Sequence, residues 1–200
     1  MVLQHIDGRT LRDYVQEFGR QDQGTALRWA IELSATLKDL HNLEPPVIHR
    51  DLTPDNIIIR KDGSLCVIDF GAANTFLGTA TCTIVGKSAY IPLEQFQGKA
   101  KLCSDIYALG GTLYFLVTGR DPEALMASDP REARGEDAET DITSEEKDAN
   151  ESVTVSDTVA ELIFSCTQME ESDRPGKLED IENTLKALIP KKEEKERESG

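Results

Sequence analysis

The sequence has no long apolar run and comparatively few basic residues. No hydrophobic stretch approaches the roughly 20 residues of a membrane-spanning helix, and the N-terminus does not have the basic-then-apolar layout of a signal peptide. The 22 Lys and Arg residues are outnumbered by 37 Asp and Glu residues, which gives a formal net charge of -15 at pH 7. A surface this acidic repels phosphate backbones and anionic lipids. We therefore expect no binding to nucleic acid or to a membrane.

Cysteine is also scarce. The four cysteines, Cys66, Cys82, Cys103 and Cys166, have neither the paired spacing of a disulfide framework nor the spacing of metal ligands. Isolated thiols are typical of proteins in a reducing compartment. Together with the missing signal-peptide pattern, this predicts a soluble, cytoplasmic protein.

The chain is long enough for one domain, or for a large part of a bigger one. Apolar residues at helical spacing predict helices over Leu11–Phe18, about Leu27–Leu40, Asp105–Val117, about Asp157–Cys166 and about Leu178–Leu188. We expect Thr10 and Ser104 to cap the first and third of these helices. The third helix is apolar on nearly every side, which predicts that it lies buried at the centre of the domain.

Two short β-branched runs, Ile57–Ile59 and Leu65–Ile68, flank a turn-forming Asp62-Gly63 pair, which predicts a β-hairpin. From Gly71 to about Gln95 neither the helical nor the strand period holds, so we expect an extended functional loop.

Two segments are dominated by charge. Asp and Glu prevail from about residue 132 to 151, and residues 190–200 are almost all charged. We expect a solvated acidic insertion and a disordered charged tail. A hydrated spacer is the default interpretation of the insertion, and a docking site for a basic partner is the alternative.

The most informative stretch is His49-Arg50-Asp51-Leu52-Thr53-Pro54-Asp55-Asn56, followed beyond the hairpin by Asp69-Phe70-Gly71. This order, H-R-D-x-x-x-x-N and then D-F-G, resembles the protein kinase family, and in particular its bacterial-type (eukaryotic-like) serine/threonine kinases. The resemblance implies an α+β, protein-kinase-like fold, with a mainly helical C-terminal lobe and a short β-hairpin at the active site. By the same match, residues 49–56 are the catalytic loop and residues 69–94 the activation segment.

The resemblance also implies the chemistry. Phosphoryl transfer needs a carboxylate that orients and deprotonates the attacking hydroxyl, and oxygen ligands for Mg²⁺ on the nucleotide phosphates. Asp51 matches the catalytic base, and Asn56 and Asp69 match the metal ligands, so ATP and Mg²⁺ are the expected cofactors. The expected partner is a protein substrate with a Ser or Thr acceptor. Alone, Asp51 or Asn56 could cap a turn and Asp69 could end a strand; their joint order favours the kinase interpretation.

Further matches extend the resemblance along the chain. The segment Gly86–Gln95 resembles the end of a kinase activation segment, which implies that Glu94 pairs with Arg174. Asp105 matches the residue that opens the family's central helix and hydrogen-bonds the catalytic loop. Because an arginine beside the base needs an anion, Arg50 implies an activation loop organised by phosphate. The candidate phosphosites are Thr79, Thr81 and Thr83, although an ordinary exposed threonine is the simpler reading of each.

The N-terminal segment resembles the hinge of a kinase. Backbone groups of Gln4 and Ile6 would bind adenine, and Ile58 would lie beneath the base. However, the chain has no G-x-G-x-x-G, and the only lysine before Asp51 is Lys38, on a predicted helix. We therefore expect residues 1–9 to be a hinge-strand remnant and residues 10–189 the C-terminal lobe of a kinase without its N-terminal lobe. Such a lobe would expose an apolar cleft face to which a partner could dock.

Two positions depart from the usual pattern together. Serine/threonine kinases commonly have Lys two residues after the catalytic Asp and Thr in the activation segment, whereas this chain has Thr53 and Lys87 there. Our hypothesis is that Lys87 reaches the transferring phosphate from the activation segment, with Thr53 beside it. An exposed loop lysine is the alternative.

Two other functions stay open at this point. The chain could be a non-catalytic, pseudokinase-like module that binds a partner protein, and absence of any phosphate transfer would favour this. It could also be a small-molecule phosphotransferase of kinase-like fold, but such enzymes typically have no segment like Gly86–Glu94 with its Arg174 partner.

Overall fold

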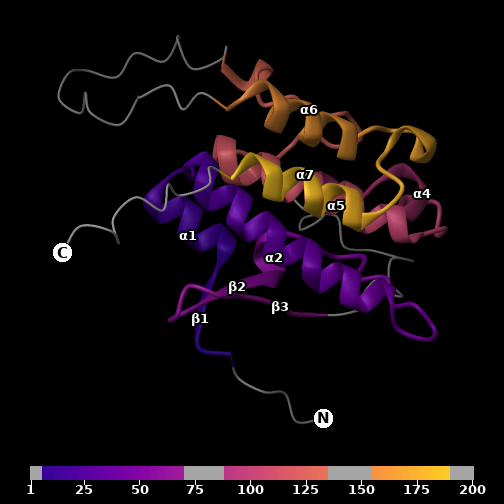
Figure 1. The fold of residues 1–200 in the computed structure, drawn as a ribbon, viewed down its shortest axis with the longest axis horizontal. Helices are drawn as coiled ribbons and strands as arrows, with labels where there is room; N and C mark the ends of the chain where they lie inside the picture. Colours follow the sequence, from indigo (N-terminus) through magenta and orange to yellow (C-terminus); the bar gives the residue numbers. More distant parts are fainter. Residues whose placement is uncertain (1–5, 70–87, 135–154, 190–200) are drawn as a thin grey trace, which may run out of the picture.

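A computed structural model describes residues 6–69, 88–134 and 155–189. A small sheet lies at one end of the molecule and helices form the rest (Figure 1). The helices are α1 (Leu11–Phe18), α2 (Gln23–His41), α4 (Leu93–Phe96), α5 (Leu102–Thr118), α6 (Asp157–Cys166) and α7 (Leu178–Leu188), joined by the 3-10 turns η1 (Pro54–Asn56), η3 (Glu132–Arg134) and η4 (Glu171–Asp173). The predicted α+β fold class, mainly helical with a short β-hairpin, is confirmed.

The first helices begin where side chains cap them. The Thr10 hydroxyl accepts a hydrogen bond from the amide of Asp13 at 3.0 Å, and Gly19 closes α1 with a left-handed φ of 79°. Asp22 caps α2 in the same way, through the amide of Thr25. These caps satisfy amide groups that the first turn of a helix leaves without a partner. The predicted cap and bounds of α1 are therefore confirmed.

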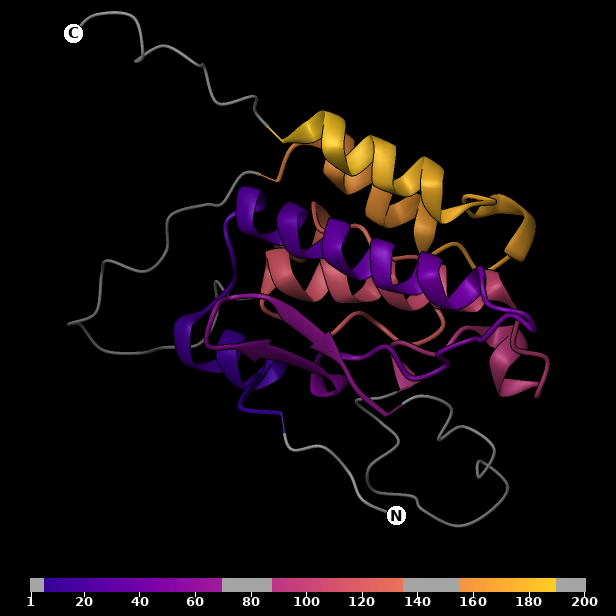
Figure 2. The same cartoon turned by 60° about the horizontal axis from the view of Figure 1, so that its bottom comes forward.

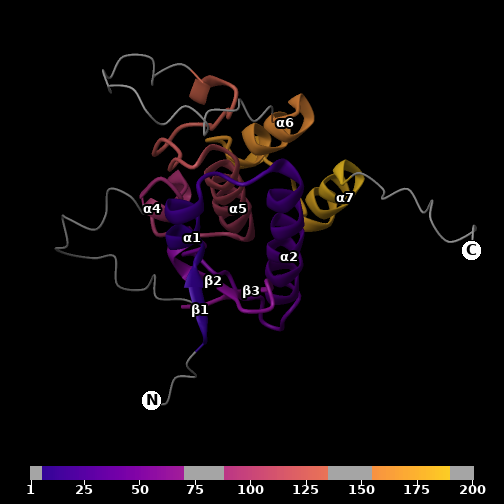
Figure 3. The same cartoon turned by 90° about the vertical axis from the view of Figure 1, so that its left-hand side faces the viewer.

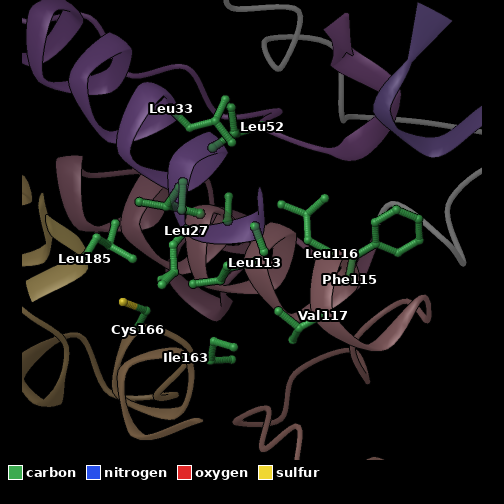
Figure 4. Close-up of a cluster of buried hydrophobic side chains, with 14 of the residues drawn as sticks. Leu27, Leu33, Leu52, Leu113, Phe115, Leu116, Val117, Ile163, Cys166 and Leu185 are labelled. Carbon is green, nitrogen blue, oxygen red and sulfur yellow. The ribbon is translucent and has the colours of Figure 1, made fainter. Parts of the chain in front are cut away.

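Helix α5 is the centre of the molecule (Figure 3), and its residues are buried along nearly their whole length. It packs against α2 on one side and α6 on the other. Leucines and branched residues from α2, α5, α6 and α7 fill the core between them (Figure 4). The predicted N-cap was wrong: the helix begins at Leu102, and Ser104 lies in its first turn, where its hydroxyl accepts from the amide of Lys101 at 3.0 Å.

The sheet has three antiparallel strands in the order β1 (Gly8–Thr10), β2 (Ile57–Arg60) and β3 (Leu65–Val67). The β2–β3 hairpin is the predicted one, whereas the pairing of β1 with β2 was not predicted. Ile57 and Ile59 are buried and Ile58 points to the other face, as the alternation of a strand requires. The hairpin runs beside α2 (Figure 2), where the Glu32 carboxylate accepts from the amide of Leu65 at 2.8 Å.

The acidic stretch begins with the turn η3, and its residues from 135 to 151 lie outside the described part of the chain, as does the tail 190–200. Among the described residues, no helix combines the length and the apolar character needed to cross a membrane.

Candidate active site

The loop 49–56, which leads into β2, is anchored on Asp105 in the first turn of α5. The Asp105 side chain is fully buried and accepts hydrogen bonds from the backbone amides of His49 and Arg50, both at 2.9 Å. His41, the last residue of α2, makes a third contact: its Nε2 lies 2.8 Å from Oδ2 of Asp105. A buried carboxylate needs such partners, because an unsatisfied one is very costly. The loop is thereby fixed to the central helix.

Arg50 has an unusual backbone conformation, with a φ of 69°. This left-handed region is uncommon for residues with a Cβ and is held only where surrounding contacts impose it. The carbonyl oxygen of Arg50 accepts a hydrogen bond of 2.6 Å from Nε2 of Gln95 on α4.

Asp51 and Asn56 lie side by side because the η1 turn folds the loop back. The Asn56 amide group donates to the carbonyl oxygen of Asp51 at 2.8 Å and to its carboxylate Oδ2 at 2.7 Å. These bonds orient the Asp51 carboxylate and leave Asn56 Oδ1 as the oxygen directed away from it.

The hairpin returns the chain to this point. Ile68, the residue before Asp69, donates its amide to the carbonyl of Asn56 at 2.9 Å. Asp69 itself is exposed and has a φ of 60°. His49 is buried, and its Nε2 lies 3.2 Å from the carbonyl oxygen of Ile68. Burial lowers the pKa of His49. The residues that match the base and the two metal ligands therefore lie at the same edge of the sheet.

No group of three or more His, Cys, Asp or Glu side chains suited to a metal ion occurs among the described residues. The two expected ligands, Asn56 and Asp69, are one amide and one carboxylate, so they would not form such a group by themselves.

Glu94 and Arg174 form a buried ion pair between α4 and η4. The guanidinium donates to both carboxylate oxygens, at 2.7 and 3.2 Å, and the Ser104 hydroxyl adds a third bond at 2.8 Å. Burial alone would raise the pKa of Glu94, but the hydrogen bonds from Arg174 and Ser104 outweigh it and lower the pKa. Arg174 also lies over the ring of Tyr107, 5.1 Å from its centroid. The contact implied by the sequence is present, and its geometry is that of a structural clamp.

A second network, which sequence reasoning missed, centres on Arg12 of α1. Its Nε lies 2.9 Å from both carboxylate oxygens of Asp55, the residue before Asn56, and its other nitrogens donate to Asp121 at 3.0 and 3.2 Å. The hydroxyl of buried Tyr90 donates to Asp121 at 2.6 Å. Arg12 thus joins the loop 49–56 to the segment that follows α5. The sequence signal, one arginine on an amphipathic helix, was too weak to reveal these partners.

Several predicted site residues lie outside the described part of the chain: Gln4, Thr79, Thr81, Thr83 and Lys87. Of the expected adenine site, Ile6 and Ile58 are described, and both are half-buried. Thr53 is buried next to Pro54 at the start of η1.

Comparisons with known proteins identify the family. A model of the protein kinase domain matches residues 1–186. The chain belongs to the protein kinase family.

The chain resembles bacterial serine/threonine kinases in particular. It is 40% identical over 128 residues to a probable serine/threonine-protein kinase of Corynebacterium efficiens, a match that covers 61% of this chain and 19% of that protein. It is 34% identical over 134 residues to serine/threonine-protein kinase PknA of Nostoc sp., with 62% and 23% covered. It is 36% identical over 130 residues to serine/threonine-protein kinase PknB of Mycolicibacterium smegmatis, with 61% and 20% covered. The chain spans about a fifth of the length of these curated relatives.

Proposed function

We propose that the chain carries the phosphoryl-transfer site of an ATP-dependent serine/threonine protein kinase. The observation that carries the proposal is the pairing of Asp51 with Asn56, in which two hydrogen bonds orient the Asp51 carboxylate. In this role Asp51 accepts the proton of the substrate hydroxyl as that oxygen attacks the γ-phosphorus of ATP, the bond to the β–γ bridging oxygen breaks and ADP leaves. The serine/threonine specificity rests on the names of the bacterial relatives.

The donor set of the site fits Mg²⁺. Because the NH₂ group of Asn56 faces Asp51, its Oδ1 is the oxygen offered to an ion, and the exposed carboxylate of Asp69 is the second ligand. Mg²⁺ prefers such oxygens and completes its coordination with nucleotide phosphates and water. When bound, Mg²⁺ would neutralise the charge that develops on the transferring phosphate.

The remaining site residues have supporting roles in this proposal. Asp105 holds the backbone of the catalytic loop, and Glu94 with Arg174 anchors the segment that follows the activation loop. Arg50 would pair with a phosphate on Thr79, Thr81 or Thr83. Ile6 and Ile58, with the backbone of Gln4, would bind adenine.

Replacing the proposed base tests this function. We expect Asp51→Asn to reduce phosphate transfer from Mg-ATP to a generic Ser/Thr-containing protein such as myelin basic protein by about 10²–10⁴-fold, because the carboxylate is lost while the shape is kept. The measurement is incorporation of radiolabelled γ-phosphate. Asp62→Asn, in the exposed hairpin turn where Asp62 bonds only Ser64 among the described residues, is the matched control and is expected to retain wild-type transfer.

Two results would contradict the proposal. One is equal transfer by wild type and Asp51→Asn. The other is the absence of any transfer by the wild-type chain, which would favour the non-catalytic protein-binding function.

A further inference from the structure

Gln95 contacts the loop 49–56, although the sequence comparison with the family assigned this residue no role. It lies half-buried on α4, one residue after the clamp residue Glu94. Its Nε2 donates to the carbonyl oxygen of Arg50 at 2.6 Å, the residue directly before the proposed base. That carbonyl belongs to the peptide that joins Arg50 to Asp51. The orientation of this peptide therefore sets the direction in which the Asp51 side chain projects.

The left-handed conformation of Arg50 is held from both sides. On its N-terminal side, the Arg50 amide donates to Oδ1 of Asp105 at 2.9 Å. On its C-terminal side, the Arg50 carbonyl accepts from Gln95. The two contacts fix the peptide planes on either side of the Arg50 Cα. A strained φ of 69° persists only when its surroundings over-determine it in this way.

Asp105 and Gln95, which contact the two peptides of Arg50, belong to segments that are hydrogen-bonded to each other. Ser104, the neighbour of Asp105 on α5, donates to Glu94, the neighbour of Gln95 on α4, at 2.8 Å. Glu94 is in turn fixed by Arg174. Glu94 and Asp105 are both buried, so α4 and the start of α5 form one hydrogen-bonded unit. Gln95 therefore lies on a segment that is hydrogen-bonded to the start of α5.

We propose that Gln95 is a positioning residue for Asp51: it holds the Arg50–Asp51 peptide in the orientation that aims the carboxylate at Asn56. The inference rests on the proposed function for its catalytic consequence, and on the contacts of Gln95 for its structural part. It gives α4, in which the predicted activation segment 69–94 ends, a direct connection to the backbone next to the proposed base.

Three variants of the 200-residue chain test this inference. Gln95→Met keeps the length of the side chain and removes the donor. Gln95→Glu keeps the shape but turns an acceptor toward the Arg50 carbonyl. Gln97→Met, two residues further on and exposed, is the matched control. For each variant, the backbone ¹³C and ¹⁵N chemical shifts of Arg50 and Asp51 are measured by NMR, together with kcat and KM for ATP and the melting temperature as a check of folding.

We expect both Gln95 variants to shift the Arg50 and Asp51 resonances and Gln97→Met to leave them in place. Turnover should fall about fivefold in Gln95→Met, the effect of one hydrogen bond, and further in Gln95→Glu, with KM for ATP unchanged. A packing role alone would leave Gln95→Glu equal to wild type, since the two side chains have the same volume.

The inference is overturned if the Arg50 and Asp51 resonances stay at their wild-type positions in both Gln95 variants, or if both variants retain wild-type kcat. If the wild-type chain transfers no phosphate, the proposed function fails instead, and the chemical shifts still decide whether Gln95 holds the loop.

Discussion

At the scale of single residues, Thr53 presents an unusual environment. Its side chain is 1% exposed, and its hydroxyl has no hydrogen-bond partner among the described residues. Burying a hydroxyl without a partner is unfavourable, so such a group in a native site calls for an explanation. Our hypothesis of a Thr53/Lys87 exchange supplies one, because an ammonium group arriving from the activation segment would donate to this oxygen.

Lys87→Ala tests the exchange. In the complete enzyme we expect turnover to fall by about 10²–10³-fold, because under this hypothesis the variant loses the positive charge that acts on the transferring phosphate. The measurement is kcat for phosphate transfer. Lys99→Ala, an exposed lysine just after α4, is the control and should behave like wild type. Wild-type turnover in Lys87→Ala would contradict the hypothesis and favour the alternative, that Lys87 is an exposed loop lysine without a catalytic role.

At the scale of elements, the Glu94–Arg174 pair joins α4 to the turn η4. The Arg174 side chain is 0% exposed and that of Glu94 is 7% exposed. Removing one partner would leave the other charge buried and unpaired. We expect Arg174→Met or Glu94→Gln to lower the free energy of unfolding by about 3–5 kcal/mol, measured by urea denaturation. Lys61→Met, which breaks an exposed pair with Asp7, is the control and should change stability little.

The same pair makes stability depend on pH. The pKa of Glu94 is lowered in the folded protein, so its contribution is complete above the ordinary carboxyl value of about 4.3 and is lost as the pH falls through the lower folded value. The stability difference between wild type and Glu94→Gln should therefore shrink in acid below about pH 4. A difference that stays constant down to pH 2 would show that the carboxylate charge does not contribute.

Local patterns in the sequence predicted most of these elements. The bounds of α1 follow from apolar periodicity and the Thr10 cap, and the approximate bounds of α6 and α7 follow from periodicity alone; all three agree with the structure. The start of α5 was misplaced because Ser104, a residue typical of an N-cap, acts from the first turn and also bonds to Glu94. Helix α4 is only four residues long, which is too short for any period to reveal.

Some contacts of the candidate site could be predicted from the sequence, and others could not. The Asp105 and Glu94–Arg174 contacts could be anticipated because they match motif positions. The contacts of Arg12, His41 and Gln95 could not, because each joins segments that only the tertiary fold brings together. Arg12, for example, bonds to Asp55 and to Asp121, 43 and 109 residues away along the chain.

At the scale of the whole molecule, the site depends on how closely α5 packs with its neighbours, since α5 carries Asp105. Gly110, in the middle of α5, allows α6 to approach: a Cβ built there would lie 2.6 Å from Cβ of Cys166 and 3.0 Å from Cγ2 of Thr167. Burial raises the pKa of Cys166 to about 12, so its thiol stays neutral. Protein interiors have little free volume to absorb an added methyl group.

Gly110→Ala measures this packing, because two effects of opposite sign compete. Alanine in a helix is favoured over glycine by up to about 1 kcal/mol, whereas overpacking a core costs about 1–3 kcal/mol. A Cβ–Cβ separation of 2.6 Å is far below van der Waals contact and the opposing atom belongs to a buried residue, so the clash should dominate. We expect the melting temperature to fall by about 2–8 °C.

Gly176→Ala, where an added Cβ meets no atom within 4 Å, is the control and should melt at or slightly above the wild-type temperature. If Gly110→Ala also melts at or above that temperature, α6 can move away from α5 without cost, and the rigid central support inferred for Asp105 would be contradicted.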